Sequence, residues 1–469
     1  MSYRQGYGTS TTLAAGGVYR SQVGDANTSA PDWFYTALAR VQATEASVAV
    51  LGCGYVGLTL ALECARAGFT VLGIETDEGR AKDLRAGANP VPDVEVPEGE
   101  LVALREAGTL SFATSLEKAC DVYVLCVNTP LRDGSPDLRY VEAAGESVAR
   151  VLASGALVVL ESTTYPGTTE ELLRPLLEEA SGLEAGRDFA IAHSPERIDP
   201  GNREWGMRNT PKVVGGLTPS STELAAAFYA GVCSSVVPVS SPRTAEITKL
   251  FENTYREVNI ALANEMAIVC HDFEIDPWEV LRAAATKPFG FTPFRPGPGV
   301  GGHCIPVDPQ YLAWRVRGKV GRQFRLLETA SDVNQRMPVH VAQRAAEILN
   351  DEGKALRGAH VLLLGVSYKG GSGDVRESPA LRIADRLVTS GADVGYHDPY
   401  VPQTAINGVI YDSQPLDDTL LASSDLVIVL TDHPDIDYRH VLATAPAVYD
   451  TRGVTSMLAA APGHRLHRT

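Results

Sequence analysis

One segment sets the architecture of this chain: Ser47-Val48-Ala49-Val50-Leu51-Gly52-Cys53-Gly54-Tyr55-Val56-Gly57. A short apolar strand runs into the spacing G-x-G-x-x-G, and a helical run over residues 58–67 follows directly. In this strand-to-helix context the glycines allow a tight turn, leave room for a pyrophosphate and let the helix pack closely, with the phosphate at the helix N-terminus. The pattern predicts a dinucleotide-binding unit, with a plain glycine turn of some other α/β protein as the alternative.

The next predicted strand, residues 70–74, ends at Glu75. An acid at this distance from the glycines binds the ribose hydroxyls of the adenosine. Its charge repels a 2′-phosphate, so the sequence favours NAD over NADP as the cofactor.

Three more apolar strands are predicted at residues 121–127, 157–160 and 189–192, each followed by polar residues. Ligands in open parallel sheets lie beyond the carboxyl ends of the strands. Candidate cofactor or water contacts are therefore Thr129, Ser162 and Thr163. Glu196, which follows the last of these strands, is a candidate base, and a solvated carboxylate paired with Arg197 is the alternative.

A long helical pattern covers residues 242–274. Lys249 and Asn253 are four residues apart and project from the same side of this helix. A lysine on a helix is most often a solvated surface charge, but beside a reactive cysteine the pair would supply two donors to an oxyanion. The helix suits a strut between domains, and it is also a candidate dimer interface.

The segment from Gly297 to Pro309 contains four glycines, three prolines and Cys304. This composition predicts a shaped loop and excludes a helix or a central strand, because glycine loosens the backbone and proline removes a donor. Cys304 is a candidate nucleophile, with Asp308 placed to take a proton or orient a water. The alternative is that Cys304 is simply a small buried apolar residue.

A second α/β unit is predicted from about His360, with strands at residues 361–365, 394–398 and 426–430. The first of these strands is followed by a glycine-rich loop, residues 366–376, that carries two cations and lacks the G-x-G-x-x-G spacing. We interpret it as an anion-binding loop for a second phosphate ligand, and a plain loop is the alternative.

Composition limits the remaining possibilities. The 469 residues predict two or three domains, and the formal charge of −16 argues against binding to nucleic acid. The seven scattered cysteines form no disulfide framework and no metal-ligand spacing, so we expect a reducing cytoplasm and no metal site. We expect neither a membrane span nor a signal peptide. Up to about Thr44 the sequence predicts a disordered lead and then a short amphipathic helix over residues 31–41.

Taken together, these motifs resemble those of the nucleotide-sugar 6-dehydrogenases, the UDP-glucose and GDP-mannose dehydrogenase superfamily, and they occur in the same order. The resemblance covers about residue 32 to the C-terminus, and residues 161–167 and 287–291 look most like the UDP-N-acetylglucosamine dehydrogenase branch. It implies an α/β fold with two Rossmann-like domains joined by a central long-helix domain, and a homodimer. The implied division is an extension at 1–45, an NAD-binding domain at 46–240, a central helical domain with the cysteine segment at 241–340 and a domain for the nucleotide-diphosphate sugar at 341–469.

The resemblance also implies a reaction, in which two hydride transfers to NAD convert the C6 alcohol of a nucleotide sugar to a uronate. Cys304 would form a thiohemiacetal and then a thioester, Lys249 and Asn253 would stabilise the oxyanion, and Asp308 would assist proton movement. Thr163 and Glu196 would position or activate water. The implied cofactor contacts are Gly52, Gly54, Tyr55, Val56, Gly57, Glu75, Thr129, Ser162 and Arg376, and the implied substrate contacts are Arg197, Phe294, Gly301 and Lys369.

The sugar and the base remain open at this stage. An N-acetylhexosamine on UDP is favoured, and a glucose nucleotide on UDP or dTDP is the near alternative, because a change in pocket contacts of about 1–3 kcal/mol can switch such preferences. A non-catalytic nucleotide-sugar sensor would not need Cys304, Lys249, Asn253 and Asp308, all of which are present. A dehydrogenase that makes a ketone would have no use for Cys304.

Overall fold

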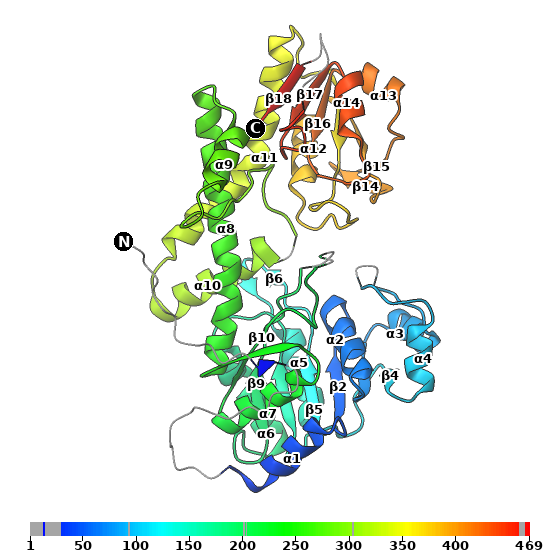
Figure 1. The fold of residues 1–469 in the computed structure, drawn as a ribbon, viewed down its shortest axis with the longest axis vertical. Helices are drawn as coiled ribbons and strands as arrows, with labels where there is room; N and C mark the ends of the chain where they lie inside the picture. The colour runs from blue at the N-terminus through cyan, green and yellow to red at the C-terminus, as the bar shows by residue number, and fades with distance from the viewer. Residues whose placement is uncertain are drawn as a thin grey trace. The chain divides into compact units, whose positions relative to one another are not determined.

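The computed structural model describes residues 13–14, 30–91, 94–199, 202, 204–302, 304–458 and 465–469. The chain forms two compact units, Met1–Phe251 and Glu252–Thr469 (Figure 1). The disordered lead predicted for the N-terminus falls on positions that lie outside the described residues, apart from Leu13 and Ala14.

The first unit is built on a nine-stranded sheet in the order β1-β11-β10-β9-β8-β5-β2-β3-β4. The strands from β9 to β4 pair in parallel, as the repeated strand-then-helix pattern predicted, whereas β10 runs antiparallel to β9. The strands are β1 (Leu13–Ala14), β2 (Ser47–Leu51), β3 (Thr70–Ile74), β4 (Leu110–Ala113), β5 (Val122–Leu125), β8 (Leu157–Leu160), β9 (Ala190–His193), β10 (Lys212–Gly216) and β11 (Ser235–Val239), with a small hairpin of β6 (Leu131–Arg132) and β7 (Ser135–Pro136).

The helices of the first unit cover this sheet. The core cluster joins the sheet to α1, α2 and α7, and the predicted N-terminal helix is confirmed as α1, which buries Phe34 and Val41. The helices are α1 (Asp32–Gln42), α2 (Tyr55–Arg66), α3 (Glu78–Ala86), α4 (Glu100–Glu106), α5 (Arg139–Ala149), the π-helix η1 (Thr169–Leu173), α6 (Arg174–Ser181) and α7 (Pro219–Ala230).

Helix α8 (Pro242–Asp272) confirms the long helix predicted from the sequence. At 31 residues it is about 46 Å long, and it runs from the first unit into the second. It is followed by α9 (Pro277–Ala285), α10 (Cys304–Val320) and α11 (Arg325–Asp351). None of the helices that the structure describes combines the length and the apolar character that a bilayer crossing needs.

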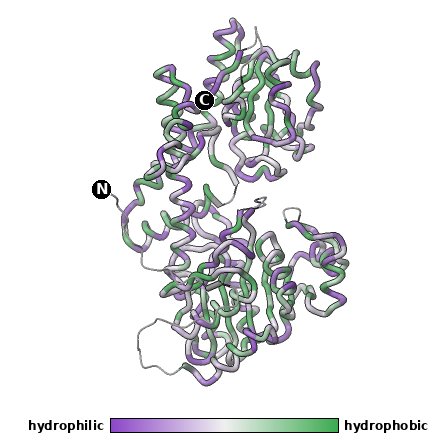
Figure 2. The backbone as a smooth tube through the Cα atoms, viewed as in Figure 1, coloured by the Kyte–Doolittle hydropathy of each residue, from purple (hydrophilic) through white to green (hydrophobic). Residues whose placement is uncertain are grey.

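The C-terminal part of the second unit is a five-stranded parallel sheet in the order β13-β12-β16-β17-β18. Alternate residues along its strands belong to two core clusters, one shared with α11 and α12 and the other with α13 and α14. Its central strands are green, the hydrophobic colour, in Figure 2. The elements are β12 (His360–Leu364), α12 (Pro379–Thr389), β13 (Asp393–His397), α13 (Asp418–Ser423), β16 (Leu426–Val429), α14 (Tyr438–Thr444), β17 (Ala447–Asp450) and β18 (Arg465–Arg468), with a hairpin of β14 (Gln403–Ile406) and β15 (Val409–Asp412).

The prediction that no helix occurs between Gly297 and Pro309 is wrong for the end of that segment. Helix α10 begins at Cys304, so only the glycine-rich part before it is a loop. Pro306 lies in the first turn, where a helix needs no N–H from the residue, and Pro309 is accommodated further along the helix. Cys304 and Asp308 are therefore one helical turn apart on α10.

Candidate functional site

The glycine turn between β2 and α2 is closed by direct backbone packing. Gly52 has φ +92°, and a Cβ added at Gly57 would lie 1.8 Å from the carbonyl oxygen of Gly52. Gly54 precedes the helix, whose first residues are Tyr55 and Val56. A Cβ at Gly54 would meet nothing within 4 Å, so the turn offers an open backbone surface at a helix N-terminus, which fits the pyrophosphate of a dinucleotide.

Glu75 lies directly after β3 and is 6% exposed. Arg80, which the sequence reading missed, bridges Glu75 to the glycine turn: its Nη2 lies 3.0 Å from Glu75 Oε2 and donates to the Cys53 carbonyl oxygen at 3.0 Å. The carboxylate is thus held beside the turn at the edge where an adenosine ribose would bind. Arg80 lies within the first turn of α3, three residues after its N-cap Asp77.

Three predicted polar contacts follow β5 and β8. The Ser162 hydroxyl donates to the carbonyl oxygens of Val127 at 2.8 Å and Leu125 at 3.2 Å, so it joins the ends of the two strands. Thr129 is buried and Thr163 is half-buried.

Beside these residues the first unit buries a set of charges that the sequence reading also missed. We call Glu161, Glu196, Lys212 and Tyr229 the charge cluster. Lys212 Nζ contacts Glu161 Oε1, lies 3.5 Å from Glu196 Oε2 and stands 5.1 Å from the centre of the Tyr229 ring. The Tyr229 hydroxyl donates to Glu161 Oε2 at 2.9 Å. The signal in the sequence was a charged residue at the end of one apolar strand, Glu161, and another at the start of the next but one, Lys212.

Within the charge cluster the pKa values of the two carboxyl groups, Glu161 and Glu196, shift in opposite directions. Burial raises the pKa of Glu161 to about 7, against the opposing charge of Lys212 and with the help of the Glu196 charge. Burial also opposes ionisation of Glu196, but the Lys212 charge, the backbone N–H of Ile198 and the Lys249 charge outweigh it and lower the pKa of Glu196. Glu196 is therefore ionised at neutral pH, whereas the ionised form of Glu161 is less favoured by its burial and depends on the Lys212 charge.

His193 lies at the end of β9 next to this cluster. Burial, followed by the charges of Lys249 and Lys212, lowers the pKa of His193 to about 3, so the ring is neutral at physiological pH. Its Nδ1 is buried and has no hydrogen-bond partner among the described residues.

Arg197, a predicted substrate contact, lies in the same unit, and its Nη1 donates to the Pro211 carbonyl oxygen at 2.5 Å.

In the second unit two predicted site residues, Asn253 and Asp308, are in contact. Asn253 Nδ2, on α8, donates to Asp308 Oδ2, on α10, at 2.7 Å, and Asp308 is 2% exposed. Cys304 is the first residue of α10, one turn before Asp308, where aligned peptide dipoles favour a negative charge. Lys249 is half-buried, one turn before Asn253 on α8.

Backbone contacts hold the glycine-rich segment before Cys304 at both ends. The Gly297 N–H donates at 2.8 Å to Oδ1 of Asn264, which is fully buried on α8 and donates in turn to Asn334 Oδ1 at 2.9 Å. At the other end the Gly302 N–H donates to the Arg376 carbonyl oxygen at 3.0 Å. A Cβ at Gly301 would lie 2.7 Å from Cβ of Tyr368, so glycine is required for this approach.

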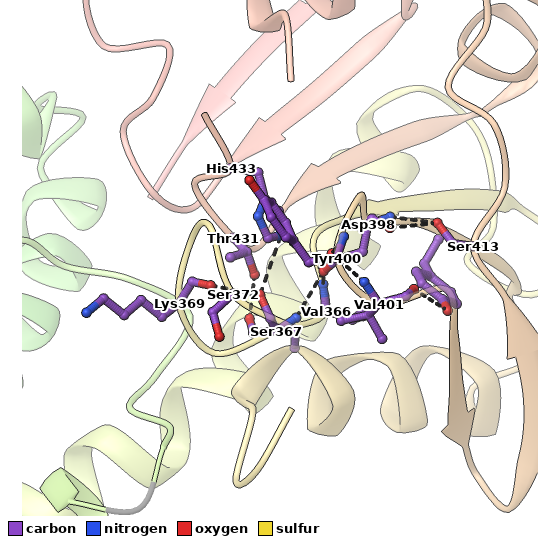
Figure 3. Close-up of polar contacts among 12 residues, drawn as sticks. Val366, Ser367, Lys369, Ser372, Asp398, Tyr400, Val401, Ser413, Thr431 and His433 are labelled. Atoms are coloured by element: carbon purple, nitrogen blue, oxygen red, sulfur yellow. Dashed lines mark hydrogen bonds and ion pairs between the residues drawn. The ribbon is translucent and has the colours of Figure 1, made fainter. Parts of the chain in front are cut away.

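The remaining predicted substrate contacts lie in the same unit. Phe294 packs edge-on against Tyr255, with ring centres 5.6 Å apart. Arg376 is exposed, and its guanidinium binds the Asp374 carboxylate, with Nη2 2.5 Å from Oδ2. The half-buried Lys369 extends away from the polar network drawn in Figure 3.

That network fixes the loop after β12, which is residues 366–376 (Figure 3). Asp398 is buried at the end of β13, and its Oδ2 accepts from Val366 N at 2.8 Å, from Ser367 N at 3.2 Å and from His433 Nε2 at 3.0 Å. Its Oδ1 accepts from Tyr400 N and Val401 N. Because His433 Nδ1 accepts from Gly371 N at 3.2 Å, the ring carries its proton on Nε2 and joins the loop to Asp398.

The glycines of this loop pack against the neighbouring strand ends. A Cβ at Gly370 would lie 1.8 Å from the Asp432 carbonyl oxygen, whereas a Cβ at Gly371, which has φ +71°, would meet nothing within 4 Å. The loop therefore presents backbone at the carboxyl end of β12, between β13 and β16, where the strand order of the sheet reverses. This is where open parallel sheets bind ligands. Within the described ranges, no group of three His, Cys, Asp or Glu side chains is arranged to hold a metal ion.

Three family models match successive parts of the chain. They are the NAD binding domain (residues 46–233), the central domain (243–336) and the UDP binding domain (362–457) of the UDP-glucose/GDP-mannose dehydrogenase family. These matches confirm the predicted architecture of two Rossmann-like domains joined by a central long-helix domain. They also confirm NAD as the cofactor, which fits the open glycine turn and the placement of Glu75.

Individual relatives agree with these matches. The chain is 34% identical over 427 residues to a UDP-N-acetyl-D-mannosamine dehydrogenase of Pyrococcus horikoshii, covering 87% of this chain and 98% of the relative. It is 38% identical over 358 residues to a UDP-N-acetyl-D-glucosamine 6-dehydrogenase of Pseudomonas aeruginosa, covering 76% and 83%. A solved structure of the UDP-D-ManNAc dehydrogenase from Pyrococcus horikoshii superposes with a TM-score of 0.80 at 33% identity, covering 90% of this chain and 98% of that chain.

Replacing Asp398 by Ala should lower the free energy of unfolding by about 3 kcal/mol or more, because it leaves four backbone N–H groups and His433 buried without their acceptor. Asp393→Ala is the matched control: it breaks an Asp–His pair with His360 in which the carboxylate is 69% exposed, and should cost at most about 1 kcal/mol. Urea unfolding measures both variants. Equal losses would show that the buried pair does not hold the loop.

The same pair predicts an acid dependence. Although burial opposes ionisation, the hydrogen bonds from His433 and from backbone N–H groups lower the pKa of Asp398. Its stabilisation is present near neutral pH and is lost as pH falls through that lowered pKa. The stability gap between the wild type and Asp398→Ala should therefore narrow on acidification.

Proposed function

Because the chain belongs to the UDP-glucose/GDP-mannose dehydrogenase family, we propose that it oxidises the C6 hydroxymethyl group of a UDP-N-acetylhexosamine to the carboxylate in the cytoplasm. The relatives at 34% and 38% identity bear the names of N-acetylhexosamine enzymes, which supports this substrate class. The product is a uronate for a polysaccharide or a glycosylated metabolite.

The proposed division of labour follows the predicted domains. Residues 46–240 bind NAD, residues 241–340 carry the cysteine segment, and residues 341–469 bind the nucleotide diphosphate of the sugar; residues 1–45 are an extension. Gly52, Gly54, Tyr55, Val56 and Gly57 hold the NAD pyrophosphate, Glu75 binds the adenosine ribose, and Thr129 and Ser162 line the cofactor site. NAD, when bound, accepts a hydride in each of the two oxidations.

In the first oxidation the C6 hydroxyl loses a proton and C6 would give up a hydride to bound NAD, which leaves the aldehyde. The thiolate of Cys304 then forms a bond to C6, and the resulting oxyanion is stabilised by Lys249 and Asn253. The proton that neutralises this oxyanion yields a thiohemiacetal. Loss of the second hydride, with the hydroxyl proton passing toward Asp308, gives a thioester.

Water completes the reaction. Its oxygen bonds to the thioester carbon while its proton passes to Glu196, and Thr163 positions the water. The tetrahedral intermediate breaks its C–S bond, so the carboxylic acid is released and the thiolate of Cys304 is restored. The observation that carries this proposal is the contact of Asn253 with buried Asp308 one turn after Cys304, because it groups a donor and a proton acceptor around the start of α10.

The proposed substrate contacts are Lys369, Arg197, Phe294 and Gly301, and Arg376 is proposed to reach a cofactor phosphate. Lys369 is supported by its place in the loop beyond β12, from which its side chain extends (Figure 3). The Arg376 guanidinium is held by Asp374 through Nε and Nη2, which orients the side chain.

The test is NADH formed per sugar consumed, with UDP-N-acetylglucosamine, UDP-N-acetylmannosamine, UDP-glucose and dTDP-glucose as substrates. We expect two NADH per sugar, and the highest kcat/KM for a UDP-N-acetylhexosamine. Cys304→Ser should lower this activity by at least about 100-fold, because the nucleophile is lost. One NADH per sugar, with an unaffected Cys304→Ser variant, would overturn the proposal.

We further propose that α8 forms a homodimer interface. Its exposed apolar side chains recur at intervals of three, four or seven residues, so they form a stripe along one face of the helix. They include Phe251 (68% exposed) and Leu262 (59% exposed), which monomeric proteins rarely leave as part of so long an apolar stripe. The stripe consists of Ile247, Phe251, Tyr255, Leu262, Met266 and Val269, and Phe273 follows it directly after the helix.

A second copy of the chain is the occupant that this stripe favours, because a 31-residue helix can lie against its own symmetry mate. Leu262→Glu combined with Met266→Glu should reduce the mass in solution, measured by light scattering, from two 50.0 kDa chains to one. The control is Val409→Glu with Ile410→Glu, which places the same charges on the equally exposed hairpin strand β15 and should leave the mass unchanged. A monomeric wild type would refute the interface.

A further inference from the structure

The charge cluster contains more ionisable groups than the proposed mechanism uses. That mechanism takes only Glu196 from it, yet Lys212 and Glu161 are equally buried, at 4% and 0% exposure. A buried ammonium and two buried carboxylates are costly to desolvate, and a sheet core can be built without them. Because Lys212 and Glu161 lie beside the proposed base Glu196, we expect them to act on that base.

The geometry assigns the two oxygens of Glu196 to different partners. Oε1 accepts from the backbone N–H groups of Arg197, at 2.5 Å, and Ile198, so the main chain fixes one side of the carboxylate. Oε2 faces Lys212 Nζ at 3.5 Å, which is an electrostatic contact rather than a strong hydrogen bond. The Glu196 side chain also hydrogen-bonds to Glu161, so its carboxylate is held by the main chain on one oxygen and by side chains of the charge cluster.

Glu161 and Tyr229 explain why Lys212 stays where it is. Burial alone would lower the pKa of Lys212, but the charges of Glu161 and Glu196 outweigh this effect and raise it, so the ammonium keeps its proton. Glu161 contacts Nζ directly, and Tyr229 fixes Glu161 from the other side while its ring faces the ammonium. Within the charge cluster, Glu161 and Tyr229 therefore hold the Lys212 ammonium in a fixed position next to the Glu196 carboxylate.

We propose that Lys212 is a positioning residue that keeps Glu196 ionised and oriented as the base for thioester hydrolysis, with Glu161 as the counter-carboxylate that holds Lys212. The proposal rests on the function proposed above. In the hydrolytic step the water proton passes to Glu196 as the C–O bond forms, and the C–S bond then breaks to release the thiolate. Without the Lys212 charge, Glu196 would be protonated already at higher pH and unable to take that proton.

Besides its chain neighbour Arg197, charged and titratable groups surround Glu196 from several elements. The sheet contributes Glu161 after β8 and Lys212 on β10, α8 contributes Lys249, and the buried neutral His193 lies at the end of β9. Cys126 and Cys233 also lie close enough to Glu196 for their charges to interact with its carboxylate, whereas Tyr229 interacts with Glu161. Of these, Lys212 is the nearest positive charge and, after burial, has the largest effect on the pKa of Glu196.

The test uses the full-length enzyme, rapid mixing with NAD and the best sugar nucleotide, and four variants. Lys212→Met removes the charge at similar length. It should preserve a burst of two NADH per active site and slow the following phase by about 10- to 100-fold. The acidic limb of its pH–rate profile should move up by about one unit or more. Glu161→Gln has nearly the shape of a neutral carboxyl group. In this variant the pH of the acidic limb should equal the wild-type value or lie below it.

Lys212→Met alone leaves the Glu161 carboxylate buried without its ion-pair partner, which could prevent folding. The double variant Lys212→Met, Glu161→Gln avoids this problem because it removes both charges of the pair. It should fold and keep the upward shift of the acidic limb. Lys354→Met, which breaks the exposed pair of Lys354 with Asp425, is the matched control and should match the wild type. A purely structural role would instead impair Lys212→Met and Glu161→Gln alike and leave the acidic limb of both in place.

The outcomes separate this inference from the function on which it rests. If the wild type produces two NADH per sugar but neither Lys212 variant moves the acidic limb, the role of Lys212 is refuted and the proposed function stands. If the wild type shows no burst and only one NADH per sugar, the proposed function itself fails, and the role of Lys212 fails with it.

Discussion

Parallel pairing brings the carboxyl ends of successive strands to one edge of a sheet, and the candidate site depends on that constraint in both units. In the first unit β2, β3, β5 and β8 end in the glycine turn, Glu75, Thr129 and Glu161. In the second unit β12, β13 and β16 end in the glycine-rich loop, Asp398 and the segment with His433. The sheet topology alone therefore places candidate site residues that are far apart in the sequence next to one another within each unit.

Buried polar groups then fix those strand ends in place. Asp398 collects five donors in the second unit, and Lys212 lies between two carboxylates in the first. Each such group is costly to bury, and in these two cases hydrogen bonds or an opposite charge compensate that cost. The result is a rigid backbone around the regions proposed to bind ligands, while residues such as Lys369 and Arg376 remain at least partly exposed.

The sequence predicted the parts of this molecule that have a local signature. The glycine spacing after Ser47–Leu51, the strands and the long helix follow from local patterns. Cys304 and Asp308, by contrast, lie on a helix where the sequence predicted a loop. The start of α10 was missed because proline counts against a helix except in its first turn. Lys212 and His433 were missed because their partners are distant in sequence: only the fold shows that Lys212 meets Glu161, 51 residues away, and that His433 meets Asp398, 35 residues away.

The central claim is that the oxidised sugar becomes covalently bound to Cys304. The most direct measurement is the intact mass of a Glu196→Gln variant quenched during turnover with NAD and a UDP-N-acetylhexosamine, followed by peptide mapping. The account predicts an added mass equal to that of the substrate minus four hydrogen atoms, located on the peptide that contains Cys304 and absent from Cys304→Ser. Turnover by the wild type to the uronate, with no such adduct in Glu196→Gln or with an adduct on another residue, would contradict it.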